Sequence, residues 1–304
     1  MSRFNFKSFG NVLEKGILRP RLLSAAAPQE PKIWVNIVLF LTTVFTTTTA
    51  GAMLEGVDFT QDLNGLLKGV PFSATILLIL GAHEFGHYFM ARKWGVKVTL
   101  PYFIPFPSII GTMGAVIKIR SRIQSKKALF DIGIAGPLAG FVLALIAFYI
   151  GLTLSHVMDQ KDTETGIVFG ESFLIHWMGV LIWGDAEQQI YLHPIGFAGW
   201  VGLLVTMLNL LPMGQLDGGH ILYSLFGNKQ TFIAKLTWVV LVGLSYFFPA
   251  YLIWVIFGMV MGLRHPAIIE DYEELDQKRK ILGYVTMIIF ILIFMPVPIR
   301  IPGA

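Results

Sequence analysis

Residues 71–93, PFSATILLILGAHEFGHYFMARK, place three ionisable side chains inside a segment that is long and apolar enough to cross a membrane. A helix needs roughly 20 predominantly apolar residues for that purpose. A charge near its centre costs roughly 2.5–3.5 kcal/mol on insertion scales. We therefore expect His83, Glu84 and His87 to serve a function. The alternative is a structural polar cluster in which Glu84 pairs with a neighbouring histidine.

The composition of the whole chain indicates a membrane protein. Of its 304 residues, 55% are hydrophobic and 14% are charged, whereas a soluble domain is nearer a quarter charged. The net charge of +4 comes from basic residues in short loops, where positive charge sets topology, so we expect no nucleic acid partner. The chain has no cysteine, which excludes disulfides, thiolate metal sites and cysteine nucleophiles.

Apolar runs elsewhere predict an all-α polytopic membrane protein with about six or seven transmembrane helices. The expected spans are 33–53, 71–93, 127–155, 194–212, two crossings within 234–263, and 281–297. A single kinked helix over 234–263 is the alternative that gives six. The apolar stretch 173–183 is too short to span and is expected to lie along the interface.

Three regions follow from these spans. We expect a cytoplasmic N-terminal tail over residues 1–32, without a signal peptide because no apolar core follows the first charges. Residues 33–225 form the expected catalytic core, and residues 226–304 form C-terminal transmembrane helices. The basic loops 92–127 and 264–280 are placed on the cytoplasmic side.

Residues 95–122 predict a small membrane-associated β-hairpin, because apolar and polar side chains alternate at 96–100 and again at 117–120. An apolar tip from Tyr102 to Ile110 would join the two strands. The edge from Gly111 to Ile119, which includes Gly114, could bind a substrate as an added strand. The alternative is a hairpin that only packs against the helices.

The sequence His83-Glu84-Phe85-Gly86-His87 fits the H-E-x-x-H pattern of zinc metalloproteases. On a helix, residues at i and i+4 share a face, so both imidazoles can reach one metal ion. Glu84 is then placed to act as general base on the metal-bound water.

A catalytic zinc ion usually has a third protein ligand. Asp217, in Leu216-Asp217-Gly218-Gly219-His220, is the candidate, since the topology puts it on the same side of the membrane as the two histidines. Taken alone, Asp217 could instead cap a helix. Gly133, Gly136 and Gly140 in the span 127–155 allow another helix to approach closely.

The chain resembles the site-2 protease family in the paired motifs His83–His87 and Asn209-x-x-Pro212-x-x-x-Leu216-Asp217-Gly218-Gly219. The resemblance covers residues 70–225. It implies one catalytic Zn²⁺ held by His83, His87 and Asp217, with Glu84 as catalytic base. It also implies that Asn209 helps to hold the substrate backbone, although its chemistry alone would equally suit a hydrogen bond at a helix end.

Many members of that family carry a PDZ domain between the motifs or a CBS pair at the C-terminus, and the segments here are too short for either. The resemblance is therefore to the compact members. It implies an intramembrane endopeptidase that cuts single-span membrane proteins or peptides. We expect a multi-pass protein of a bacterial inner membrane, with its active site toward the cytoplasmic side.

Two other functions fit some of these features. A metal-binding transporter would use the same residues as an ion path. A prenyl-processing metalloprotease would need a downstream glutamate ligand, for which Glu270, Glu273 and Glu274 are candidates without a partner motif. We expect His193, His220 and His265 to be polar or interfacial residues, with His220 the candidate for a role beside the ligands.

Overall fold

The computed structural model describes residues 32–58, 63–157, 168–184, 190–266, 268 and 274–300. The expected tail over residues 1–32 lies outside them, apart from Lys32. Residues 34–304 form one compact unit. Its main helices are α2 (Ile33–Leu54), α3 (Val70–Lys93), α4 (Lys126–Leu154), α5 (Phe173–Trp183), α6 (Pro194–Leu210), α7 (Asp217–Phe226), α8 (Lys229–Phe247), α9 (Leu252–Met261) and α10 (Gln277–Ile293), with the short 3-10 helices η1 (Asn64–Gly69) and η2 (Pro249–Tyr251).

Within the described residues, four helical segments are long and apolar enough to cross a membrane: α2, η1 with α3, α4 and α8. The first three of these segments match the expected spans at 33–53, 71–93 and 127–155. The expected count of six or seven is not confirmed, because α6 and α10 have 17 residues each and α9 has 10. Residues 234–263 form two helices broken at Pro249, as the hairpin interpretation predicts.

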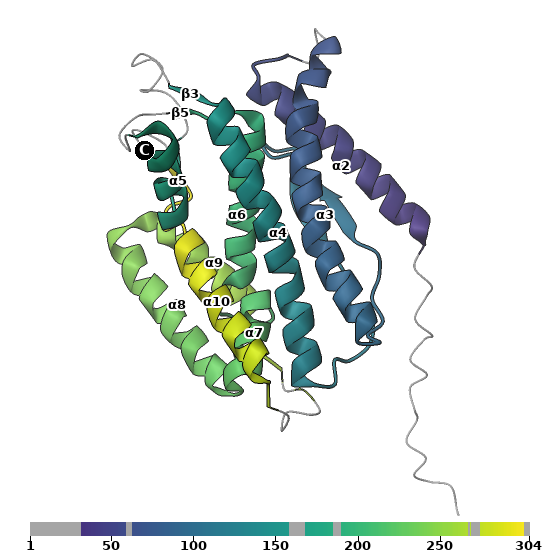
Figure 1. The fold of residues 1–304 in the computed structure, drawn as a ribbon, viewed down its shortest axis with the longest axis vertical. Helices are drawn as coiled ribbons and strands as arrows, with labels where there is room; N and C mark the ends of the chain where they lie inside the picture. The colour runs from purple at the N-terminus through teal and green to yellow at the C-terminus, as the bar shows by residue number, and fades with distance from the viewer. Residues whose placement is uncertain are drawn as a thin grey trace, which may run out of the picture. The chain divides into compact units, whose positions relative to one another are not determined.

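The core is built by three helices in mutual contact, α3, α4 and α6 (Figure 1). Small residues let these helices approach closely. A Cβ atom added to Gly151 of α4 would lie 2.0 Å from the Cα of Gly196 in α6, and one added to Gly199 would lie 2.4 Å from the backbone nitrogen of Phe148. Close helix approach through small residues is the usual packing mode of membrane helices.

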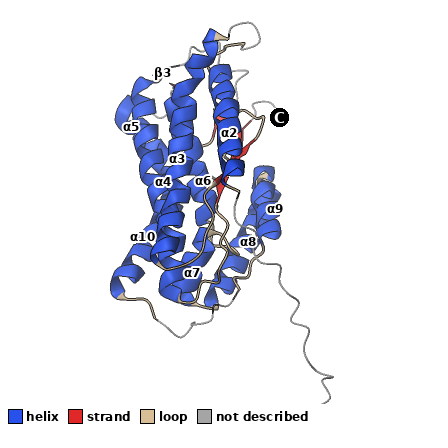
Figure 2. Ribbon diagram, turned by 90° about the vertical axis from the view of Figure 1, so that its right-hand side faces the viewer, coloured by secondary structure: helices blue, strands red, loops and turns tan. Residues whose placement is uncertain are grey.

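Six short strands pair as three antiparallel two-stranded sheets among the described residues. β1 (Tyr102–Pro105) pairs with β2 (Thr112–Val116) and forms the β-hairpin, which lies beside α2 in Figure 2. β3 (His156–Val157) pairs with β5 (Ile190–Tyr191), and β4 (Val168–Phe169) pairs with β6 (Ile299–Arg300). The last pair joins the C-terminal end of the chain to the loop after α4.

The strands of the hairpin lie nearer its tip than the sequence predicts. The alternating segments make only an isolated bridge, Val98 with Ile119, whereas β1 begins at Tyr102, inside the expected apolar tip. Pro101 explains the interruption, since it has no N–H to donate to a strand ladder. A shorter loop therefore joins β1 to β2.

Helix α2 holds the hairpin at both ends. The Asn36 side chain donates to the carbonyl oxygen of Pro101 at 2.9 Å, and the Thr46 hydroxyl donates to that of Gly111 at 2.7 Å. Gly111 has no room for a side chain, because an added Cβ would lie 2.4 Å from the carbonyl oxygen of Thr46. α2 is joined in turn to α3 by a 2.6 Å hydrogen bond between Thr47 and Ser73.

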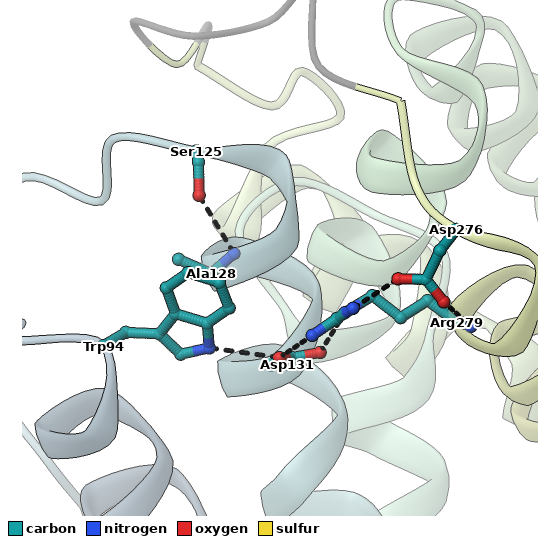
Figure 3. A network of polar contacts seen from close by, with 6 residues as sticks. All are labelled: Trp94, Ser125, Ala128, Asp131, Asp276 and Arg279. Atoms are coloured by element: carbon teal, nitrogen blue, oxygen red, sulfur yellow. Dashed lines mark hydrogen bonds and ion pairs between the residues drawn. The ribbon is translucent and has the colours of Figure 1, made fainter.

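An ion pair ties the start of α10 to α4 (Figure 3). The Arg279 guanidinium donates from Nε and Nη2 to the two carboxylate oxygens of Asp131, both at 2.7 Å. Asp131 also accepts from the Trp94 indole at 3.1 Å, and Asp276 caps α10 by accepting from the Arg279 backbone. The fork geometry suits a carboxylate in a way that a lysine ammonium does not.

We predict that Arg279→Lys lowers the midpoint of thermal unfolding in detergent. The substitution keeps the positive charge but loses the paired hydrogen bonds to Asp131, which are worth about 1–3 kcal/mol for charged groups. Lys280→Gln is the matched control, because its contact with the exposed Glu274 contributes little. Equal midpoints for Arg279→Lys and Lys280→Gln would show that the ion pair between Arg279 and Asp131 does not stabilise the fold.

Candidate metal centre

Helix α3 places His83, Glu84 and His87 at the inner face of the three-helix core. All three side chains are buried. Residues i and i+4 stand one turn apart on a helix, and here the Nε2 atoms of the two histidines lie 3.1 Å from each other. The sequence motif therefore produces a pair of imidazoles that converge on one point.

The glycines of α4 make room for these rings. A Cβ added to Gly136 would lie 2.1 Å from the Nε2 atom of His87, and one added to Gly140 would lie 3.1 Å from Nδ1 of His83. Gly86 of α3 lies against the backbone of α4, because its added Cβ would meet the carbonyl oxygen of Ala135 at 2.6 Å. The expected close approach is confirmed, and its consequence is space for the histidines.

Asp217 reaches the pair from the other side of the core. It is the first residue of α7, whose N-cap is Leu216, so Asp217 is not the helix cap. The two following glycines let this turn pack against the end of α6. A Cβ added to Gly218 would lie 2.0 Å from the carbonyl oxygen of Leu210, and one added to Gly219 would lie 2.4 Å from that of Gly214.

The three side chains form a compact donor set. The Oδ2 atom of Asp217 lies 3.4 Å from Nε2 of His83 and 3.2 Å from Nε2 of His87. Ligands about 2.0–2.1 Å from a tetrahedral Zn²⁺ lie about 3.3 Å from one another. These residues therefore fit a zinc ion, and a set of three protein donors is typical of catalytic rather than structural zinc. They are also the one cluster of metal-binding geometry found in the described part of the chain.

The second nitrogen of His87 supports this assignment, whereas that of His83 does not. Nδ1 of His87 lies 2.7 Å from the carbonyl oxygen of Ile132. A carbonyl can only accept, so Nδ1 carries the proton and Nε2 is free to bind a metal. Nδ1 of His83 is buried and has no partner among the described residues.

A cavity of about 1130 Å³ opens next to the donor set. Glu84 lines it together with the three donor residues, and Ala115 to Ile119 of the hairpin form part of its wall. The backbone of Ile117 lies beside the Glu84 carboxylate. The cavity therefore brings a carboxylate, a candidate metal site and the outer part of β2 together.

Of the two predicted substrate-binding residues, Asn209 lies at the centre. Its amide nitrogen is 3.3 Å from Nε2 of His83, so its side chain reaches across to α3 and does not cap the end of α6. Gly114 lies within β2 at a φ of 105°, and its neighbour Ala115 is the first residue of the hairpin to line the cavity. An added side chain at Gly114 would meet open space but would strain this backbone.

The three other histidines considered in the sequence fall into two groups. His193 caps α6 by accepting from the backbone of Ile195 at 3.2 Å, as expected for a polar residue at a helix end. His220 and His265 both line the cavity, and 2.7 Å separates Nδ1 of His220 from Nε2 of His265. The sequence gives no signal for the contact between His220 and His265, since 45 residues separate them.

The model of peptidase family M50 matches residues 71–248, more than half of the chain. The chain belongs to peptidase family M50. The matched residues include the His83–His87 motif and Asp217, so the similarity to site-2 proteases noted in the sequence is confirmed.

Three curated relatives of this M50 chain are plant proteins. It is 34% identical over 249 residues to "Probable zinc metalloprotease EGY2, chloroplastic" of Arabidopsis thaliana, covering 80% of this chain and 44% of the relative. The EGY2 protein of Oryza sativa subsp. indica is 30% identical over 302 residues, 94% of this chain and 53% of the relative. "Probable zinc metalloprotease EGY1, chloroplastic" of Arabidopsis thaliana is 32% identical over 237 residues, 75% of this chain and 43% of the relative.

The M50 chain thus spans about half the length of the relatives it matches. Their names describe metalloproteases, so the transporter alternative has no support from them. They are also chloroplastic, so they do not support the expectation of a bacterial inner membrane.

We predict that Gly136→Ala removes bound zinc, because its Cβ would occupy the space of the His87 ring. Displacing a ligand in this way should weaken zinc affinity by about 10–100-fold, as loss of a ligand-supporting contact does. Metal analysis of the purified protein after dialysis against a chelator measures the effect. Gly243→Ala in α8 is the control, since its Cβ meets open space. Full zinc retention in Gly136→Ala would contradict the proposed position of the site.

Proposed function

We propose that this chain is a zinc-dependent endopeptidase that hydrolyses peptide bonds in or near transmembrane segments. The observation that carries the proposal is the convergence of His83, His87 and Asp217 beside the buried Glu84 in one cavity. Membership of family M50 and the names of the relatives support hydrolysis of peptides. The apolar helices around the cavity support a substrate that lies in the membrane.

The proposed chemistry divides between the metal and the chain. A Zn²⁺ ion held by His83, His87 and Asp217 would lower the pKa of a water molecule and polarise the scissile carbonyl. Glu84 takes the proton from the attacking water and returns it to the leaving amine. Its position next to His83 on α3, with its carboxylate lining the cavity, suits both steps.

The substrate would bind in an extended form along β2. Outside its pairing with β1, this strand has no further partner strand among the described residues, so its other edge is available. A transmembrane helix must unwind before it can be cut, which leaves backbone groups unsatisfied in lipid. The edge that includes Gly114 would supply partners for those groups. Asn209 would hold the substrate backbone beside the metal.

The substrates we propose are single-span membrane proteins or peptides. The protein is a multi-pass membrane protein. We place its reactive side chains toward the side that carries the basic loops, which the positive-inside rule assigns to the cytoplasm. Cleavage would therefore release a fragment of the substrate on that side.

We predict that Glu84→Gln abolishes cleavage and leaves zinc bound. The amide keeps the size of the side chain but cannot take a proton, and loss of general acid–base catalysis costs about 10²–10⁴-fold in rate. Cleavage of a single-span substrate in proteoliposomes, together with zinc analysis of the same sample, measures both effects. Wild-type turnover by Glu84→Gln would exclude this mechanism, and zinc-driven transport without cleavage would favour the transporter.

We predict that Asp217→Ala loses both zinc and activity, because two histidines alone leave the donor set incomplete. Asp217→His is the informative second variant, since an imidazole can also bind zinc and should retain part of the metal. Isothermal titration with Zn²⁺ compares the affinities. Unchanged affinity in Asp217→Ala would remove this residue from the ligand set.

A further inference from the structure

His220, which is half-buried, and the buried His265 form a pair that the proposed chemistry does not use. His220 belongs to α7, one turn after Asp217, and His265 lies between α9 and α10. Both line the cavity that holds Glu84 and the three candidate ligands. Their contact, 2.7 Å between Nδ1 of His220 and Nε2 of His265, is a short hydrogen bond.

The surroundings of His265 fix which of its nitrogens carries the proton. Nδ1 of His265 lies 2.6 Å from the carbonyl oxygen of Pro266. Because that oxygen can only accept, Nδ1 donates to it. Burial also lowers the pKa of His265, which favours the neutral ring at neutral pH. In the neutral ring the other nitrogen, Nε2, is an acceptor.

The proton on His220 follows from the same reasoning. Since Nε2 of His265 accepts, Nδ1 of His220 must donate to it. A neutral His220 then has an unprotonated Nε2, the opposite of the tautomer that an isolated imidazole prefers. No described residue bonds this Nε2 atom, and the side chain lines the cavity.

Both rings are held in place by further contacts. The ring of Tyr223 stacks on His265 with 4.3 Å between centroids and 21° between planes. Gly133 of α4 leaves room for His220, because a Cβ added there would lie 3.0 Å from the Cβ of His220. The Ser224 hydroxyl donates to the His220 carbonyl oxygen at 2.8 Å. Such support is expected for a side chain whose orientation matters.

We propose that His220 is a hydrogen-bond acceptor for a backbone N–H of the substrate, and that His265 is a positioning residue that fixes the tautomer of His220. The inference rests on the proposed protease function for the identity of the bound group. An extended substrate presents N–H groups at regular intervals, and β2 can satisfy only those on one of its edges. His220 of α7 lines the same cavity as β2, so its acceptor is available to an N–H group that β2 does not satisfy.

The tautomer is measured directly by NMR on the full-length, zinc-loaded protein labelled with ¹⁵N-histidine in detergent. The signals of His220 are assigned by their loss in His220→Gln. We expect Nδ1 of His220 to be protonated and Nε2 to be unprotonated in the wild type. A His220 that carries its proton on Nε2 in the wild type overturns the proposal.

Two replacements of His265 then separate positioning from packing. His265→Gln keeps an acceptor for Nδ1 of His220, whereas His265→Phe keeps a ring that can stack on Tyr223 but has no acceptor. We expect His265→Phe to move the His220 proton to Nε2 and to raise KM for a single-span substrate, with kcat/KM lower by about 10–100-fold. His265→Gln should keep most of the wild-type His220 tautomer and most of the wild-type kcat/KM. Zinc content should be unchanged in His265→Phe and in His265→Gln.

The control is His176→Gln on α5, where the His176 ring lies near Glu171 and Trp177, both exposed, and outside the cavity lining. It should match the wild type in KM and zinc content. Equal KM values for His265→Phe and wild type would overturn the positioning role. Failure of the protease proposal is recognised separately, because Glu84→Gln would then turn over substrate normally while the tautomer of His220 stayed as predicted.

Discussion

The site depends on how closely α4 crosses α3. Gly136 lies against the His87 ring, where a methyl group would overlap ring atoms, and Gly140 lies against the His83 ring, where a methyl group would make a tight contact. Lipid chains are as apolar as leucine, so membrane helices associate through close packing rather than burial from water. In this protein the same packing sets the space in which two imidazoles converge. Fold stability and site geometry therefore rest on one helix crossing.

The crossing also satisfies polar groups that would be costly in an apolar core. The carbonyl oxygen of Ile132, on α4, accepts from Nδ1 of His87, and Asn209, on α6, lies against Nε2 of His83. A buried polar group without a partner costs about 1–3 kcal/mol. The packing of α4 against α3 thus orients the His87 ring, and Asn209 of α6 lies next to the nitrogen of His83 that would bind the metal.

Local sequence identifies residues that the structure brings together as a candidate metal site, but it predicts less of the geometry that supports them. The motif at His83–His87 and the length of its helix are properties of one segment, which is why they could be predicted. The strands of the hairpin were placed too far from its tip, because Pro101 interrupts the pairing that alternation suggested. The contact between His220 and His265 joins residues 45 positions apart and left no periodic signal. The glycines of α4 predict the close approach of another helix, but they do not predict that histidine rings fill the space beside them.

The C-terminal part of the chain contributes more than additional hydrophobic helices. The match to the M50 model ends at residue 248, yet His265 and Ile268 still line the cavity beside the candidate ligands. The bidentate contact between Arg279 and Asp131 fixes the start of α10 against α4, the helix whose glycines make room for the site. His265 is thus anchored on α7 through His220, and the start of α10 is anchored on α4 through Arg279. Both anchors lie on helices that also shape the donor set, since α7 carries Asp217 and the glycines of α4 make room for the histidine rings.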